Sequence, residues 1–206
     1  GNNMKLNKLV TVRTGKNFSR NKVSKEEVVP YTYDDLTKDL SEFAPYRKDG
    51  AGQKITAKNE VNSDEDNYLV SSGDVVFSFV SSTAGIVSKC SEGKVLNQNF
   101  AKLIIESKQL DPRYLCYCLN QSSHLKKQMA VAMQGSTLRR LTPSSLRELD
   151  IPIVNFSQQH NIGHAYFSLL KRQYLLEQKK QQEEDFVLAL LETQLESEVN
   201  QEVNNG

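Results

Sequence analysis

The segment from Ser157 to about Val199 contains no proline and no cluster of turn-forming residues, which predicts one uninterrupted helix. Ser157 is the predicted N-cap, because a serine hydroxyl accepts hydrogen bonds from the free amides of a first helical turn. About 43 residues at 1.5 Å per residue give a helix of roughly 64 Å. A helix of this length is typical of an arm rather than of an element inside a compact core.

The apolar residues of this segment follow a heptad-like seam at its two ends. Steps of four and three from Ile162 give ten positions through Gln194, six of them apolar, and the polar run EQKKQQEED interrupts the seam in the middle. So narrow a stripe does not suit packing against the chain's own domain, and we expect a partner helix. The alternative is a solvated helix with a frayed tail. The predicted dimerisation residues are Ile162, Tyr166, Leu169, Leu176, Val187 and Leu190.

Composition allows one sizeable domain before this helix. The chain has 206 residues, of which 38% are hydrophobic and 25% are charged, as is typical of globular proteins. The net charge of +1 hides an asymmetry, because residues 1–150 carry 22 Lys/Arg against 17 Asp/Glu, whereas residues 151–206 carry 4 against 8. A mildly basic domain suits a polyanionic partner, although a net charge of +5 is also common in proteins that bind no nucleic acid.

Several classes of protein are excluded or disfavoured. No apolar run approaches the roughly 18 residues that span a bilayer, and no signal peptide opens the sequence, so we expect a cytoplasmic protein without a membrane partner. We interpret Gly1–Asn3, before Met4, as a tag remnant. Cys90, Cys116 and Cys118 cannot all pair, and we expect free thiols in a reducing compartment.

The region before the helix predicts a mixed α+β domain. Alternating or β-rich runs indicate strands at 9–13, 75–80 and 100–105, with extended chain at 28–31 and a short strand at 86–87. Residues 44–66 are polar and contain glycine, which predicts a long surface loop. Three helices are predicted to start at Asp111-Pro112, at Ser122 or Ser123, and at Thr142-Pro143. Gly135 ends the second of these helices, and Pro152 follows the third.

The sequence contains no complete motif for catalysis or for metal binding. His160 and His164 stand four residues apart, but Asn161 replaces the glutamate of a zinc-protease motif, and no third ligand is evident. Asp111-Pro112-Arg113-Tyr114 lacks the second proline of the Asp-Pro-Pro-Tyr motif of adenine methyltransferases, so we interpret it as a helix start. We therefore predict a binding protein that has no enzymatic activity, no metal site and no cofactor of its own.

A series of short motifs resembles one known family. The motifs follow one another along the chain in this order: Leu6–Leu9 with Arg13–Lys16, Pro30-Tyr31 with Asp35-Leu36, Gly73–Val76 with Gly85, Asn97–Asn99, Tyr114–Tyr117, and a last segment that runs from Gly135–Thr137 through Ile151–Ile153 to Gln158-Gln159 and Ile162. Together they resemble the DNA-specificity (S) subunit of type I restriction-modification systems. The family often carries more prolines after the Ile-Pro-Ile step, where Val154-Asn155 stand here. The usual subunit has two recognition domains and two spacer helices, whereas this sequence has one of each.

The resemblance implies a half subunit, a fragment, or one member of a swapping set. Residues 1–152 would be a DNA target-recognition domain, residues 153–200 a spacer and dimerisation helix, and residues 201–206 a frayed tail. The helix would pair antiparallel with that of a second copy or of another half subunit. Methyltransferase subunits, and in restriction a nuclease subunit, would bind the arms. S-adenosylmethionine, ATP and Mg²⁺ are implied only for those partner subunits.

Residue type and loop position give the candidate contacts to double-stranded DNA. Arginine favours guanine and asparagine or glutamine favours adenine, whereas lysine and arginine also bind phosphates. The predicted DNA-binding residues are Lys16, Asn17, Arg20, Lys22, Gln53, Lys54, Ser81, Ser82, Thr83, Gln134, Arg139 and Arg140. The competing hypothesis is a scaffold or decoy that binds methyltransferase subunits but no DNA.

Overall fold

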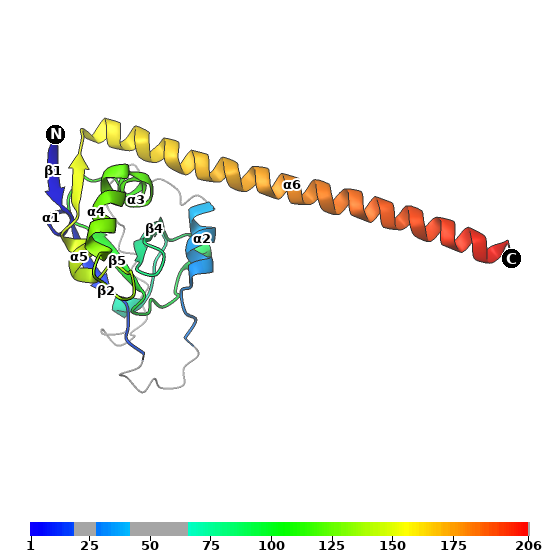
Figure 1. Cartoon of the computed structure of the whole chain (residues 1–206), viewed down its shortest axis with the longest axis horizontal. Helices are drawn as coiled ribbons and strands as arrows, with labels where there is room; N and C mark the ends of the chain where they lie inside the picture. Colours follow the sequence, from blue (N-terminus) through cyan, green and yellow to red (C-terminus); the bar gives the residue numbers. More distant parts are fainter. Residues whose placement is uncertain (19–27, 42–65, 206) are drawn as a thin grey trace. The chain divides into compact units, whose positions relative to one another are not determined.

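The computed structural model describes residues 1–18, 28–41 and 66–205. By its internal contacts the chain divides into two compact units, Gly1–Ser168 and Leu169–Gly206. The first unit contains all the strands of the described chain and α1 to α5, and the second is formed by helix (Figure 1). The sequence-based boundary at residue 152 falls in the last strand, whereas the compact unit continues through the first turns of the long helix.

A four-stranded antiparallel sheet organises the first unit. Its order is β2 (Val10–Thr14), β5 (Phe100–Ile105), β3 (Val75–Ser78) and β4 (Thr83–Ile86). The strands predicted at 9–13 and 100–105 are confirmed within one residue. The strand predicted at 75–80 ends at Ser78, and the next strand already begins at Thr83, because a tight hairpin joins the two with Ser78 paired to Thr83.

One cluster of the hydrophobic core lies between this sheet and helix α2 (Tyr33–Ser41). Tyr31, Leu36, Val76, Leu96 and Phe100 are all buried in one cluster, and the rings of Tyr31 and Phe100 meet edge to face with their centroids 5.4 Å apart. Pro30 forms a parallel bridge with Val95, which agrees with the extended chain predicted at 28–31. Burying this apolar surface is the main favourable contribution to the fold. Most of the long loop predicted at 44–66 lies outside the described residues.

A second, two-stranded sheet joins the beginning of the chain to the segment before the long helix. β1 (Asn2–Lys5) pairs antiparallel with β6 (Asp150–Ile153), with Met4 opposite Ile151. The residues interpreted as a tag remnant therefore belong in part to a strand. The short α1 (Leu6–Leu9) follows, and its first amide donates to the carbonyl of Leu149 at 2.8 Å.

Three helices lie between β5 and β6, and side-chain caps explain where two of them begin. α3 (Pro112–Gln121) starts after Asp111, whose carboxylate accepts from two backbone amides, and α5 (Pro143–Arg147) starts after Thr142, whose hydroxyl accepts from Ser145. Both helix starts were predicted from the sequence and are confirmed. α4 (Ser123–Met133) lies between them and ends just before Gly135, which has a φ of 84°. Two 3₁₀ turns, η1 (Asp66–Tyr68) and η2 (Lys89–Ser91), complete the described unit.

The long helix α6 runs from Phe156 to Asn204, 49 residues. Its N-cap is Asn155, whose side-chain oxygen accepts from the amide of Gln158 at 2.9 Å. Ser157 is therefore inside the helix, and the cap predicted there is wrong by two residues, because an asparagine amide oxygen serves as well as a hydroxyl. At 1.5 Å per residue the helix is about 74 Å long.

Candidate nucleic-acid interface

Loops that are far apart in sequence meet at one end of the four-stranded sheet, where its strands begin or finish. In an antiparallel sheet, the end of one strand lies beside the beginning of its neighbour. The pairs Thr14 with Ala101, and Ser78 with both Phe100 and Thr83, therefore bring the end of β2, the start of β5 and the β3–β4 hairpin together. We call the following set the polar edge: Lys16, Asn17, Asn97, Gln98, Asn99, Val80, Ser81, Ser82, Leu138, Arg139 and Arg140.

The loop after β2 is fixed by backbone hydrogen bonds to the segment before β5. The Gly15 amide donates to the Phe100 carbonyl at 2.9 Å, and the Lys16 amide donates to the Leu96 carbonyl at 2.8 Å. Gly15 is needed here for space, since a Cβ at this position would overlap the carbonyl of Asn97. The Lys16 ammonium lies 5.8 Å from the centre of the Phe18 ring, a cation–π contact within this loop.

The β3–β4 hairpin forms the middle of the polar edge. The Phe79 amide donates to the Asn99 carbonyl at 2.9 Å, and the Thr83 hydroxyl donates to the Ser81 carbonyl at 3.1 Å. Ser82 has a φ of 50°, in the left-handed region that costs a serine conformational energy. These hydrogen bonds join the hairpin to the segment before β5 and close its turn.

The segment after α4 brings two arginines to the same edge. The Ser136 amide donates to the Met133 carbonyl at 3.2 Å, and the Arg139 amide donates to the Ser136 carbonyl at 3.3 Å. Arg139 has a φ of 47°, the second left-handed non-glycine residue of the described chain. The Arg140 guanidinium lies 3.5 Å from the side-chain oxygen of Asn99, which connects this loop to the segment before β5.

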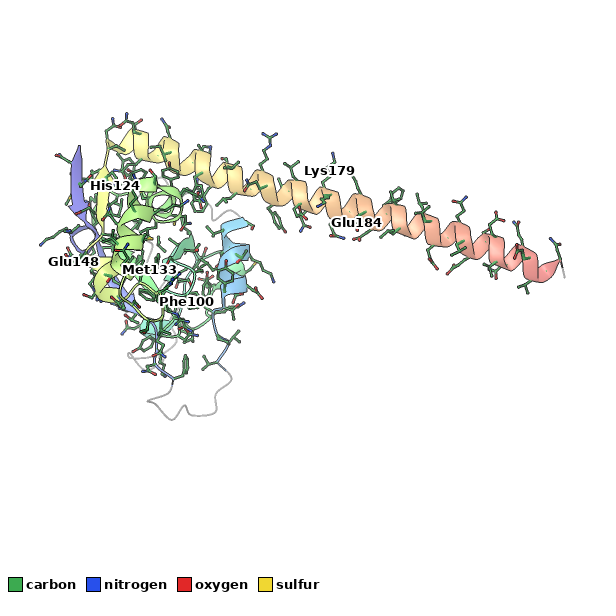
Figure 2. All side chains as sticks on the ribbon, in the orientation of Figure 1. Phe100, His124, Met133, Glu148, Lys179 and Glu184 are labelled. Carbon is green, nitrogen blue, oxygen red and sulfur yellow. The ribbon has the colours of Figure 1, made fainter. Side chains whose placement is uncertain are left out.

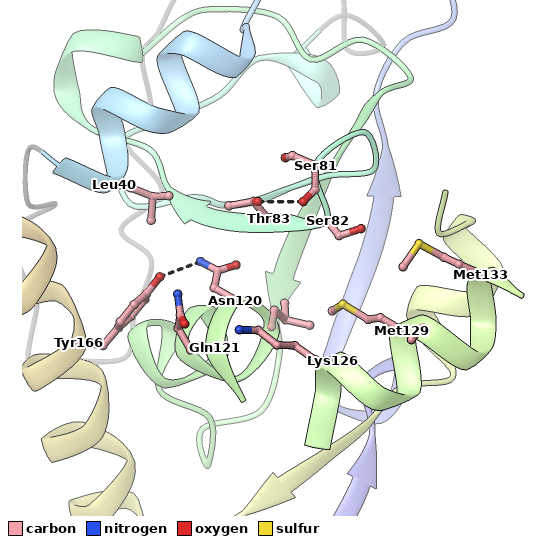
Figure 3. Close-up of a pocket in the computed structure, with 12 residues that line it drawn as sticks. Leu40, Ser81, Ser82, Thr83, Asn120, Gln121, Lys126, Met129, Met133 and Tyr166 are labelled. Atoms are coloured by element: carbon pink, nitrogen blue, oxygen red, sulfur yellow. Dashed lines mark hydrogen bonds between the residues drawn. The ribbon is translucent and has the colours of Figure 1, made fainter. Parts of the chain in front are cut away.

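A pocket of about 440 Å³ lies behind the hairpin (Figure 3). Leu119, Met129 and Met133 give it apolar walls, and Lys126 adds a cation from α4. Asn120 holds the hairpin side of the pocket, because its side chain accepts from the Ala84 amide at 2.7 Å and donates to the Ala84 carbonyl at 2.8 Å. It also donates to the Tyr166 hydroxyl at 3.1 Å, so α3, β4 and the start of α6 are joined through one amide.

The structure places the predicted DNA-binding residues unequally. Lys16, Asn17, Ser81, Ser82, Arg139 and Arg140 lie on loops of the polar edge, Thr83 is the first residue of β4, and Gln134 is the exposed C-cap of α4. Arg20, Lys22, Gln53 and Lys54 lie outside the described residues. The sequence-based set omitted Asn97, Gln98 and Asn99, although three consecutive amide side chains directly before a strand were a visible signal for a recognition loop.

The perturbed titratable groups of this unit are explained by packing. Asp39 accepts from Tyr31, Ser88 and Ser91 at 2.7–2.8 Å, and burial together with the Asp39 charge raises the pKa of Tyr31. Burial opposes ionisation of Asp35, but hydrogen bonds from Lys94 and Thr32 outweigh it, so the pKa of Asp35 is lowered. These acidic groups tie α2 to the segment before β5, a structural role.

The cysteines of the described chain are free thiols, and two of its histidines stack on the long helix. All three cysteines are free, and burial raises the pKa of the Cys118 thiol to about 11, which leaves it protonated and unreactive at neutral pH. His160 and His164 stack with centroids 6.2 Å apart, and His160 lies 3.8 Å from the carboxylate of Asp111. Among the described residues no group of three or more potential metal ligands gathers. No helix in those ranges is long and apolar enough to cross a membrane.

The predicted dimerisation seam divides between the two units. Every described residue from Lys171 to Asn205 is exposed, and the side chains surround α6 in Figure 2. Leu169, Leu176, Val187 and Leu190 expose half of their surface or more, whereas Ile162 is half-buried. Tyr166 is only 8% exposed, because it packs edge to face on Tyr117 and bonds Asn120. Its position therefore differs from the predicted one: it contacts its own domain.

Comparison with known proteins identifies the family. The family described as "Type I restriction modification DNA specificity domain" matches residues 2–184, and the chain belongs to this family. The resemblance inferred from the short motifs is therefore confirmed. None of the curated protein sequences matches.

Two solved structures share the fold, and a third matches with a lower score. The HsdS subunit from Thermoanaerobacter tengcongensis matches with a TM-score of 0.50 and 16% identity, over 87% of this chain and 39% of that chain. A structure described as the "structural basis underlying complex assembly and conformational transition of the type I R-M system" matches with a TM-score of 0.53 and 16% identity, over 92% and 43%. The S subunit of a type I system from M. genitalium matches with a TM-score of 0.47 and 14% identity, over 80% and 37%. The chain thus spans about two fifths of each solved chain.

Proposed function

We propose that this chain recognises one half-site of a two-part DNA target through the polar edge. The observation that carries the proposal is the meeting of three sheet-end loops and the Arg139-Arg140 loop at one place, with amides, hydroxyls and cations side by side. Asn99 and Gln98 have the donor and acceptor pair that matches adenine, and the arginines match guanine or phosphate. Backbone hydrogen bonds hold the two loops that contain the left-handed residues, and a preformed surface loses less entropy on binding.

We further propose that α6 pairs antiparallel with the same helix of a second copy, or with that of another half subunit. The two halves of this segment have net charges of opposite sign. Residues 156–180 carry four Lys/Arg against one Glu, and residues 181–206 carry seven Asp/Glu and no Lys/Arg. An antiparallel pair places each basic half beside an acidic half, whereas a parallel pair would place like charges together. Exposed Leu169, Leu176, Val187 and Leu190, with Leu191 and Leu195, supply the apolar contact.

In this arrangement the paired helices set the distance between two half-sites. Methyltransferase subunits, and a nuclease subunit where restriction occurs, bind along the complex and bring the chemistry. S-adenosylmethionine, ATP and Mg²⁺ belong to those subunits, and this chain supplies sequence recognition without catalysis. A cytoplasmic location follows from this role, because the target is chromosomal and invading DNA.

Selection of duplexes from a random pool by the purified chain tests the proposal. We expect enrichment of a defined sequence, with an affinity that falls steeply as salt rises. Replacing Arg139 and Arg140 by alanine should lower the salt slope by about one for each phosphate that is no longer neutralised, or relax one position of the sequence. Lys89→Ala with Lys108→Ala removes the same charge from exposed positions outside the polar edge and is the matched control. Salt-independent or absent binding would favour the scaffold hypothesis instead.

A further inference from the structure

Two large aliphatic side chains interrupt the otherwise hydrophilic polar edge. Leu138 is 75% exposed, and Val80 at the hairpin is 55% exposed. Most of the other exposed large hydrophobic residues of the described chain lie on α6, the helix proposed above to pair with a second helix. Leu138 is thus among the most exposed apolar side chains of the first unit, and it lies directly before Arg139 and Arg140.

The exposure of Leu138 is built into the backbone. Its loop is fixed at one end by the bond from Ser136 to Met133, and at the other by Leu141, which is 2% exposed, and by the Thr142 cap. Only a few residues separate these anchors, and one of them, Arg139, adopts the left-handed conformation. The loop therefore holds the leucine outward next to cations that suit a DNA backbone, although exposing a leucine to water is unfavourable.

The chemistry of base edges limits what such a side chain can contact. Leucine has neither donor nor acceptor, so it cannot discriminate the hydrogen-bonding groups of bases. In the major groove of unmodified DNA, the thymine 5-methyl is the apolar group that distinguishes one base pair from another. We infer that Leu138 contacts a thymine methyl group in the half-site and makes this chain prefer thymine at that position. The inference rests on the proposed function and names one specificity-determining residue within it.

A double-mutant cycle between protein and DNA tests this contact. Once the preferred duplex is known, each thymine is replaced in turn by deoxyuridine, which removes only the methyl group. Wild-type protein should lose about fourfold in affinity at one position, as expected for one buried methyl group. Leu138→Ala should bind the thymine duplex correspondingly more weakly and should lose nothing further with deoxyuridine at that position. Val131→Ala, a 66% exposed aliphatic residue on α4, is the control and should keep the full deoxyuridine effect.

The outcomes separate failure of the inference from failure of the proposed function. If wild type binds a specific duplex but Leu138→Ala responds to deoxyuridine as wild type does, Leu138 is not the methyl contact and the inference is wrong. A preferred half-site without thymine overturns it too. Weakened assembly with methyltransferase subunits, with unchanged DNA affinity, would assign the leucine to a protein partner instead. If wild type binds no specific duplex, the proposed function itself fails.

Discussion

Gln159 joins the first turn of α6 to the compact unit, and its removal should have a large effect for a polar substitution. The side chain is 1% exposed and makes three hydrogen bonds: it accepts from the Asp111 amide at 3.0 Å and donates to the carbonyls of Gln109 and Val154 at 2.7 and 2.9 Å. Gln159→Ala leaves the buried Asp111 amide without this partner, whereas the two carbonyls belong to more exposed residues and can gain water.

The magnitude follows from these environments. One buried unsatisfied amide costs about 1–3 kcal/mol, and two partly solvated carbonyls add about 0.5 kcal/mol each, so we expect a loss of about 2–4 kcal/mol. For a chain of this size that lowers Tm by about 5–15 °C. Thermal unfolding followed by circular dichroism measures the change. Gln158→Ala is the matched control, because this neighbouring glutamine is exposed and should change Tm by less than about 2 °C. Equal small shifts in both variants would refute the anchoring role of Gln159.

Three further perturbations test other parts of the structure. Asp35→Asn should destabilise the chain by about 1–2 kcal/mol at pH 7. Because the Asp35 pKa is lowered in the folded state, this difference should be full above the unfolded-state pKa of about 4. In urea titrations it should disappear only as the pH falls through the lower folded-state pKa. Gly163→Ala places a Cβ 2.7 Å from the Cβ of Arg113, so the free energy of unfolding should fall. Helix propensity alone predicts the opposite, a gain of about 1 kcal/mol. A higher Tm for this variant would contradict the packing. Lys180→Glu reverses a charge in the basic half of α6 and should weaken self-association roughly fivefold at low salt and less at high salt. Sedimentation equilibrium measures the dissociation constant, and an unchanged value would argue against antiparallel pairing.

Much of the fold could be predicted because its signals are local. Asp111-Pro112 and Thr142-Pro143 determine helix starts through contacts within one turn. The residues of β2 alternate with the period of a half-buried strand, and β5 is a short, mostly apolar run. The long helix was predictable for the same reason. Its first residue was misplaced because Asn155 and Ser157 are both good caps, and the choice depends on the preceding strand β6, which pairs with a segment about 150 residues earlier.

The candidate site was only partly predictable because it depends on pairing between distant strands. Nothing near Asn99 in the sequence indicates that its carbonyl meets Phe79 or that its side chain meets Arg140. Likewise, Tyr166 fits the apolar seam by spacing alone, and only the fold reveals that Tyr117 and Asn120 already cover it. Helix periodicity identifies a face, but it does not tell whether that face meets the same chain or a second one.

Mapping adenine methylation across the source genome, with and without this gene, tests the central claim most directly. The account predicts that one two-part methylated motif disappears when the gene is deleted and returns when the gene is restored. A palindromic motif would indicate pairing of two identical copies, and an asymmetric one would indicate pairing with a different half. A methylation pattern that does not change on deletion, in cells whose methyltransferase subunits are present and active, would contradict a role in DNA recognition.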